Sequence, residues 1–176
     1  MSGSLNSILF LDDEESILNA LRRSLRKEGY KLFFALTPDD ALTVLKQEKI
    51  EVVFSDHLMP EMTGLEFIKL VKEMYPDTKR CILTGQADLE LAVKAINEGH
   101  VHRFLMKPWN DLELKVTLSQ LFHQIELERE NKTLNAVVAK QKSRIQELEK
   151  QHPGISSVQR DDSGAIVIDD VDLDGS

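Results

Sequence analysis

Three acidic side chains, a threonine and a lysine stand directly after short apolar segments of the chain. They are Asp12 and Asp13 after residues 8–11, Asp56 after 51–55, Thr84 after 80–83 and Lys107 after 102–106. Neighbouring carboxylates repel one another unless a cation lies among them, and an oxygen-rich set suits a hard divalent ion such as Mg²⁺. A carboxylate can also be the nucleophile that forms an acyl phosphate, while a lysine and a hydroxyl suit phosphate oxygens. These residue types predict a site that accepts a phosphoryl group on an aspartate.

The apolar segments must form one parallel sheet if these side chains are to meet. Five such segments alternate with stretches of helical periodicity: residues 8–11, 31–35, 51–55, 80–83 and 102–106. Continuous apolar runs are typical of strands that are buried on both faces. The alternation predicts an α/β fold, a doubly wound, flavodoxin-like sheet of five strands in the order 2-1-3-4-5. Ligands bind at the carboxyl ends of such strands, so we expect the polar residues at one edge. A single acidic residue there is more often a cap or turn residue, and only the joint placement favours chemistry.

The sequence strongly resembles the receiver domain of two-component response regulators between residues 5 and 127. The matching segments are Ile8–Glu14, Phe54–Pro60 followed by Gly64, Leu83–Gly85 and Phe104–Trp109. They occur in the order and at the spacing of that family, which makes the resemblance specific.

The resemblance implies a role for each residue of the site. Asp56 is expected to be the phosphoacceptor, and Lys107 is expected to pair with the phosphate. Mg²⁺ is expected as the cofactor, held by Asp56, by Asp13 directly, by Asp12 through water and by the backbone carbonyl of Leu58. The phosphoryl donor is expected to be a sensor histidine kinase or a histidine phosphotransfer protein. No enzymatic activity is expected beyond self-phosphorylation from phosphodonors and self-dephosphorylation.

The resemblance also implies a switch. Thr84 is expected to turn toward the phosphate, and Phe104 is expected to rotate inward after it. The alternative for Phe104 is plain core filling. The affected face consists of the fourth helix, the fifth strand and the fifth helix, and a local charge change would bias it between two states. The Lys107–Pro108 peptide bond is expected to be cis.

A long helix is predicted after the fifth strand, because no Gly or Pro occurs between Trp109 and His152. Residues Leu127, Asn131, Leu134, Val138, Gln141, Ile145 and Leu148 alternate spacings of four and three. This heptad pattern, with a lone Asn at position a, predicts a coiled coil and a parallel homodimer through residues 127–148. The alternative is a solvated linker helix.

The predicted organisation is therefore a receiver domain at residues 1–127, a coiled-coil extension of the fifth helix at 128–152, and an acidic tail or hairpin at 153–176. Two outputs remain open. The chain is either the receiver part of a larger regulator, with a cyclic-di-nucleotide phosphodiesterase or a transcription activator as effector, or a stand-alone phosphorelay adaptor. A basic cluster at Arg22, Arg23, Arg26 and Lys27 either helps to dock the phosphoryl donor or is a solvated helix face.

Composition limits the remaining classes. The formal net charge is −8, which argues against direct nucleic-acid binding by this chain. No apolar stretch is long enough for a membrane span, so no membrane association and a cytoplasmic location are expected. The single Cys81 lies in an apolar run and is expected to be a buried, reduced thiol.

Overall fold

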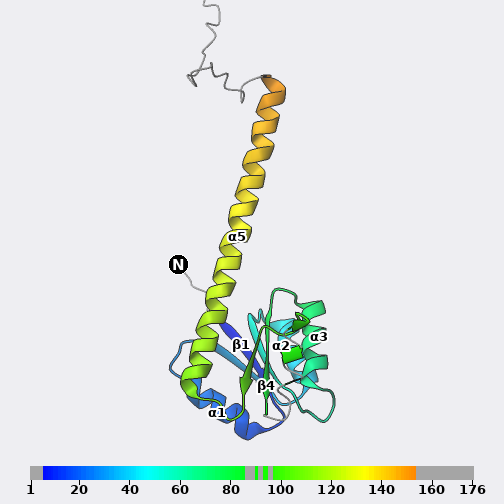
Figure 1. Ribbon diagram of the computed structural model, residues 1–176, viewed down its shortest axis with the longest axis vertical. Helices are drawn as coiled ribbons and strands as arrows, with labels where there is room; N and C mark the ends of the chain where they lie inside the picture. Colours follow the sequence, from blue (N-terminus) through cyan, green and yellow to red (C-terminus); the bar gives the residue numbers. More distant parts are fainter. Residues whose placement is uncertain (1–5, 86–89, 91–92, 95–96, 154–176) are drawn as a thin grey trace, which may run out of the picture. The chain divides into compact units, whose positions relative to one another are not determined.

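The sheet has the predicted topology. The structure is a computed structural model that describes residues 6–85, 90, 93–94 and 97–153. Five strands form one parallel sheet in the order β2-β1-β3-β4-β5 (Figure 1). They are β1 (Ser7–Leu11), β2 (Lys31–Ala35), β3 (Val52–Asp56), β4 (Lys79–Thr84) and β5 (Arg103–Met106). The α/β, flavodoxin-like prediction is confirmed, and each strand begins and ends within one residue of the predicted segment.

Helices cover both faces of the sheet. They are α1 (Glu15–Leu25), α2 (Pro38–Gln47), α3 (Gly64–Met74) and α5 (Asp111–Gln151). One buried cluster joins side chains of α1 and α5 to the sheet, and a second cluster joins those of α2 and α3 to the opposite face. Figure 1 shows the ribbons of these four helices around the sheet. Between β4 and β5, residues 90, 93, 94 and 97 are helical. The rest of the helix predicted there lies outside the described residues.

Side-chain caps fix where α2 and α3 begin. Thr37 accepts a hydrogen bond from the backbone N–H of Asp40 at 3.2 Å, and Pro38 occupies the first helical position. Thr63 and Glu66 form a reciprocal capping box at the start of α3, with the Glu66 carboxylate 2.8 Å from the Thr63 backbone nitrogen. The backbone and side-chain hydrogen bonds from Thr63 lower the pKa of Glu66. Since α3 follows the loop after β3, the box also fixes the path of the chain next to Asp56.

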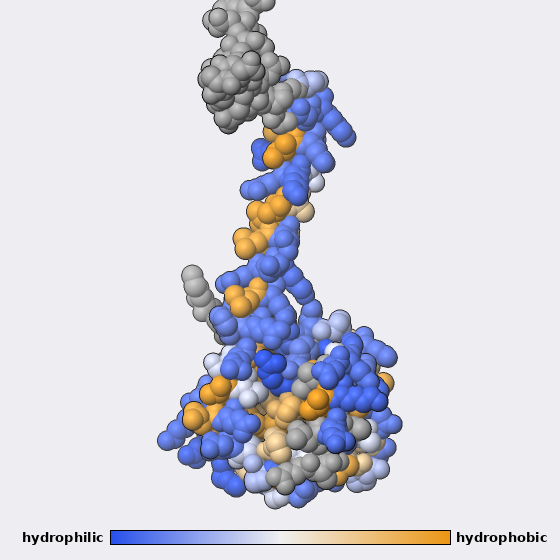
Figure 2. Space-filling model, viewed as in Figure 1, coloured by the Kyte–Doolittle hydropathy of each residue, from blue (hydrophilic) through white to orange (hydrophobic). Residues whose placement is uncertain are grey.

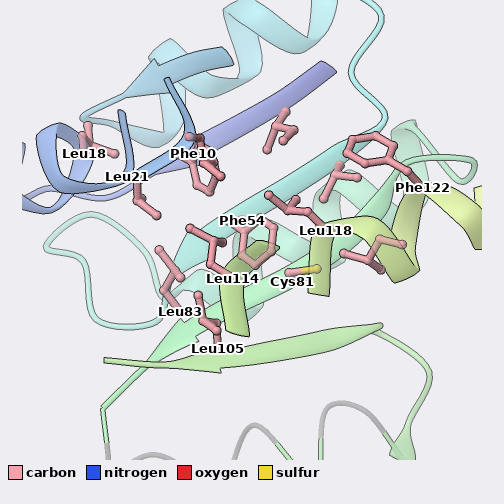
Figure 3. Packing of buried hydrophobic residues seen from close by; sticks show 14 of the residues in the cluster. Phe10, Leu18, Leu21, Phe54, Cys81, Leu83, Leu105, Leu114, Leu118 and Phe122 are labelled. Atoms are coloured by element: carbon pink, nitrogen blue, oxygen red, sulfur yellow. The ribbon is translucent and has the colours of Figure 1, made fainter. Parts of the chain in front are cut away.

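The three central strands are buried along their whole length, as the apolar runs predicted. Three aromatic rings stack on the α1 and α5 side of the sheet, and Figure 3 shows two of them, Phe10 and Phe54. The Phe10 ring lies between Phe34, at 5.8 Å between centroids, and Phe54, at 5.3 Å. The Arg22 guanidinium lies 4.5 Å from the centroid of Phe34. Cys81 continues this layer and is fully buried, and burial raises the pKa of its thiol far above the ordinary value.

A close backbone approach joins α3 to β3. Gly64 donates its N–H to the carbonyl of His57 at 2.9 Å. A Cβ atom added at Gly64 would overlap the main-chain carbonyl of Asp56. Glycine is therefore required here for space, since any side chain would separate the first turn of α3 from the end of β3.

The chain divides into two compact units, residues 1–126 and 127–176. Within the first unit, the α5 side chains Leu114, Leu118, Leu121, Phe122 and Ile125 are buried. In the second unit, α5 continues to Gln151. Among the described residues, no helix is long and apolar enough to cross a membrane. The predicted three-part division of the chain stays a prediction, and the hairpin proposed within residues 153–176 lies outside the described residues.

Candidate functional site

Three carboxylates meet at the carboxyl edge of the sheet. Asp12 and Asp13 directly follow β1, and Asp56 is the last residue of β3, the parallel neighbour of β1. One carboxylate oxygen of each of the three lies within 4.8 Å of the others. Asp12 is fully buried and Asp56 is 7% exposed, whereas Asp13 is open to solvent. The strand ends therefore bring together the acidic residues that the sequence predicted, with one of them facing water.

The ammonium of Lys107 bridges the two buried carboxylates. Its Nζ donates to Asp12 Oδ2 at 2.6 Å and to Asp56 Oδ1 at 2.8 Å. Burial raises the pKa of Asp12, and the hydrogen bond from Lys107 opposes this only in part. Burial also acts to lower the pKa of Lys107, but the hydrogen bonds to the two carboxylates and their charges outweigh it and raise that pKa. Lys107 is therefore held as a cation between the carboxylates.

Backbone N–H groups fix the second oxygen of each buried carboxylate. The N–H of Glu14 donates to Asp12 Oδ1 at 3.0 Å, and the N–H of Leu58 donates to Asp56 Oδ2 at 3.1 Å. Both donors stand two residues after the aspartate, which is the pattern of an Asx turn. These two donors were not predicted from the sequence, although a spacing of two residues after an aspartate is the signal of such a turn. The two turns orient the carboxylates before any ligand arrives.

The donor set fits a magnesium ion. Mg²⁺ prefers oxygen ligands, keeps several of its waters and takes few protein groups. The carboxylates of Asp12, Asp13 and Asp56 offer such oxygens, and the exposure of Asp13 leaves room for water. The Leu58 side chain is 64% exposed beside the site. Metal binding by the backbone carbonyl of Leu58 stays a prediction.

Thr84 and Phe104 lie on neighbouring strands. Thr84 ends β4, is fully buried and donates its hydroxyl to the carbonyl of Gly85 at 3.2 Å. Phe104 pairs with Ile82 in the β4–β5 ladder. Its half-buried ring packs against the cluster on the α2 and α3 side. The structure thus places Thr84 at the edge that carries the carboxylates, while the coupled motion of Thr84 and Phe104 stays a prediction. The Lys107–Pro108 peptide bond is cis, as expected.

Comparison with known proteins identifies the family. The response regulator receiver domain family matches residues 8–119, so the chain belongs to this family. The hydrogenase transcriptional regulatory protein HoxA of Cupriavidus necator is 33% identical over 109 residues, which cover 62% of this chain and 22% of HoxA. The DNA-binding transcriptional regulator NtrC of Proteus hauseri is 33% identical over 129 residues, covering 73% of this chain and 26% of NtrC. The chain spans only these minor fractions of both regulators.

Solved structures agree with this assignment. The signal receiver domain of an HD domain-containing protein from Pseudomonas fluorescens Pf-5 superposes with a TM-score of 0.66 and 37% identity, covering 70% of this chain and 98% of that one. NtrX from Brucella abortus superposes with a TM-score of 0.70 and 26% identity, covering 74% of this chain and 30% of that one. Receiver domains of this family bind Mg²⁺ at the acidic pocket and receive phosphoryl groups from histidine kinases.

Proposed function

We propose that this chain is a phosphorylation-controlled switch in which Asp56 accepts a phosphoryl group from a sensor histidine kinase or a histidine phosphotransfer protein. In this step the P–N bond of a phosphohistidine breaks, and a P–O bond forms to the Asp56 carboxylate. The product is an acyl phosphate, and the histidine leaves as a neutral imidazole once it has a proton. The observation that carries this proposal is the pair of hydrogen bonds from Lys107 to Asp12 and Asp56, next to a third, exposed carboxylate.

Each residue of the site has a separate role in phosphoryl transfer and in the switch that follows it. Bound Mg²⁺ would neutralise charge on the transferring phosphoryl group. Lys107 would move part of its contact from the Asp56 carboxylate to the phosphate oxygens. The acyl phosphate adds nearly two negative charges and three acceptor oxygens at the end of β3. Thr84 would then turn its hydroxyl from Gly85 toward the phosphate, and Phe104 would rotate into the space beside β4. We expect no turnover of other substrates.

Intact mass after incubation with a small phosphodonor tests the acceptor. With Mg²⁺ the wild-type chain should gain one phosphoryl group, whereas Asp56→Asn should gain none. Chelation of the metal should suppress the gain in the wild type. Phosphorylation of Asp56→Asn to the same extent would refute the assignment of the acceptor. Gain of mass without a divalent ion would refute the metal requirement instead.

We also propose that residues 127–148 of α5 form a parallel homodimer. Five apolar side chains of the heptad are 40–64% exposed: Leu127, Leu134, Val138, Ile145 and Leu148. Figure 2 shows apolar side chains recurring along this stretch between hydrophilic ones. A second copy would cover these side chains, and Asn131 at position a favours two parallel strands. Asn131 also accepts a hydrogen bond from Asn135 of the same helix at 2.6 Å, which orients its side chain.

Oligomeric mass tests the dimer. Light scattering should give twice the 20.0 kDa mass of one chain. Leu134→Lys places a charge in the seam and should give a monomer. Ala139→Lys, which adds the same charge one residue after the seam position Val138, should leave the dimer intact. A monomeric wild type, or loss of the dimer in both variants, would contradict the proposed seam.

The output is proposed from the relatives. HoxA and NtrC are named as transcriptional regulators, and the chain covers about a quarter or less of each. We propose that this chain is the receiver part of a larger transcription regulator. The regulator would lie in the cytoplasm with its phosphoryl donor, and this chain would make no nucleic-acid contacts of its own. One alternative is a cyclic-di-nucleotide phosphodiesterase as effector, and the other is a stand-alone phosphorelay adaptor. A solved receiver domain similar to this chain belongs to an HD domain-containing protein, so receivers of this kind are also joined to effectors other than those of HoxA and NtrC. Sequencing of the gene beyond the codon for residue 176 tests this proposal. A reading frame that continues into an effector domain indicates a larger regulator, and a stop codon indicates an adaptor.

A further inference from the structure

A groove lies between α1 and the start of α5, outside the cluster of carboxylates. Its volume is about 860 Å³. Small-molecule sites commonly measure about 300–1,000 Å³, so the groove has the size of a ligand site. Its apolar lining comes from Ile17 and Ala20 of α1 and from Pro108 and Trp109 after β5.

Two polar contacts between α1 and α5 hold the walls of this groove together. The Ser24 hydroxyl donates to Asp111 Oδ1 at 2.6 Å. The Lys115 ammonium lies 2.8 Å from Glu28 Oε1. Both acidic side chains in the groove therefore have a hydrogen-bond donor, and the charge of Glu28 is also opposed by the Lys115 ammonium.

Three cations in the groove differ from the others that line it. Lys107 and Lys115 are paired with carboxylates, whereas Arg23, Arg26 and Lys27 make no ion pair with any residue that the structure describes. Arg23 and Arg26 are three residues apart and so share a face of the helix end. The negative end of the helix dipole stabilises cations at the C-terminal end of α1. This accounts for the presence of cations there but not for their position along a groove.

Trp109 adds an aromatic surface to the same groove. Its ring is half-buried, packs on the core cluster of α1 and α5, and lines the groove. A groove lined by both a tryptophan ring and guanidinium groups without ion pairs is complementary to a ligand that combines a flat ring with negative charge. A purely acidic ligand would leave the apolar lining unused, and a neutral aromatic ligand would leave the cations unmatched.

We infer that the groove between α1 and α5 binds a nucleoside phosphate, with the base against Trp109 and the phosphates toward Arg23, Arg26 and Lys27. The proposed ligand does not require Asp56 to accept a phosphoryl group in order to bind, so the inference stands apart from the proposed function. Lys107 connects the two sites, because it lines the groove and also bonds to Asp12 and Asp56. Occupancy of the groove would therefore be felt at the phosphoryl-accepting carboxylates.

Trp109 is the only tryptophan of the chain, so all tryptophan fluorescence comes from a residue that lines the groove. ATP, titrated with chelator present to exclude the metal site, should give a saturable change in the fluorescence of the full chain, with matching heat in calorimetry. Arg26→Gln should weaken binding by about tenfold, the scale of one charge-assisted contact. Arg22→Gln, on the same helix but outside the groove, should leave the affinity unchanged. Adenosine and inorganic triphosphate should each bind at least about tenfold more weakly than ATP.

Three results would overturn the inference. The first is the absence of both a saturable fluorescence change and heat at millimolar ATP. The second is binding of inorganic triphosphate, or of an acidic peptide, as tightly as ATP, since the base would then contribute nothing. The third is an equal loss of affinity in Arg22→Gln and Arg26→Gln, which would indicate a general charge effect. Failure of Asp56 to accept phosphate would leave the inference unaffected.

Discussion

Substitution of Gly64 by alanine should separate α3 from the strand that carries the acceptor. The added Cβ would overlap the carbonyl of Asp56, which belongs to the backbone of β3. A side-chain neighbour can change rotamer, but a strand carbonyl in the centre of a sheet can move only with its strand. The first turn of α3 must therefore shift, and the 2.9 Å hydrogen bond from the Gly64 N–H to the His57 carbonyl must lengthen.

The expected loss of unfolding free energy in Gly64→Ala follows from two opposing contributions. Overpacking of a tight interior costs about 1–3 kcal/mol, and contact with rigid backbone places this site near the upper end, at about 3 kcal/mol. Alanine recovers about 0.5–1 kcal/mol because it restricts the unfolded chain more than glycine does. The net loss of unfolding free energy is about 2 kcal/mol, which lowers the urea midpoint by about 1 M at a slope of about 2 kcal/mol/M.

Urea unfolding of Gly64→Ala and Gly85→Ala provides a matched comparison. A Cβ at Gly85 meets nothing within 4 Å, so this variant should stay within about 0.5 kcal/mol of the wild type. Gly64→Ala should also accept phosphate from a small donor more slowly, because the end of β3 is displaced. A Gly64→Ala variant as stable as the wild type would refute the reasoning from close approach, and equal losses in both variants would show that only the glycine character matters.

Three further predictions concern charges and caps. Lys107→Met leaves the fully buried Asp12 without its ammonium partner and should lower the unfolding free energy in chelator by about 3 kcal/mol, with partial recovery in Mg²⁺; no loss in urea titrations would contradict this. The Cys81 thiol has its pKa raised by burial above the ordinary 9.0, so its contribution to stability is present below that pH and is lost above it. Between about pH 8 and pH 10 the wild type should lose about 1 kcal/mol more unfolding free energy than Cys81→Ala, and parallel curves would disprove it. Thr63→Ala removes the capping box of α3 and should cost about 1 kcal/mol by thermal unfolding, whereas Thr63→Ser should keep most of the stability.

The fold was predictable because its strands are buried on both faces. Such strands appear in the sequence as continuous apolar runs, and their parallel order follows from the helices between them. Asp12 and Asp56 were predicted at one edge for the same reason, since Asp12 directly follows β1 and Asp56 ends β3. The carboxyl ends of parallel strands leave no other location for them.

Other parts of the site depend on contacts that a residue pattern does not contain. The overlap at Gly64 arises from the distance between α3 and β3, which sequence spacing does not specify. The groove at Trp109 results from the way α1 and α5 pack together, so the sequence pattern of the basic cluster of α1 predicts only a docking or a solvated face. The rotation of Phe104 concerns a second state, and one structure of one state contains no information on it. The dimer seam is visible in the sequence, but its pairing requires a second chain.

The stacked rings of Phe34, Phe10 and Phe54 have a consequence for the dynamics of the core. A ring held between two others in a close-packed interior can turn by half a revolution only when its neighbours move aside together. The flip rate of the Phe10 ring, measured from NMR line shapes, therefore reports how often the packing around this ring opens on microsecond to millisecond times. Phe54 stands two residues before Asp56. Phosphorylation of the Asp56 carboxylate can therefore change the flip rate of Phe10 without moving any residue out of the sheet.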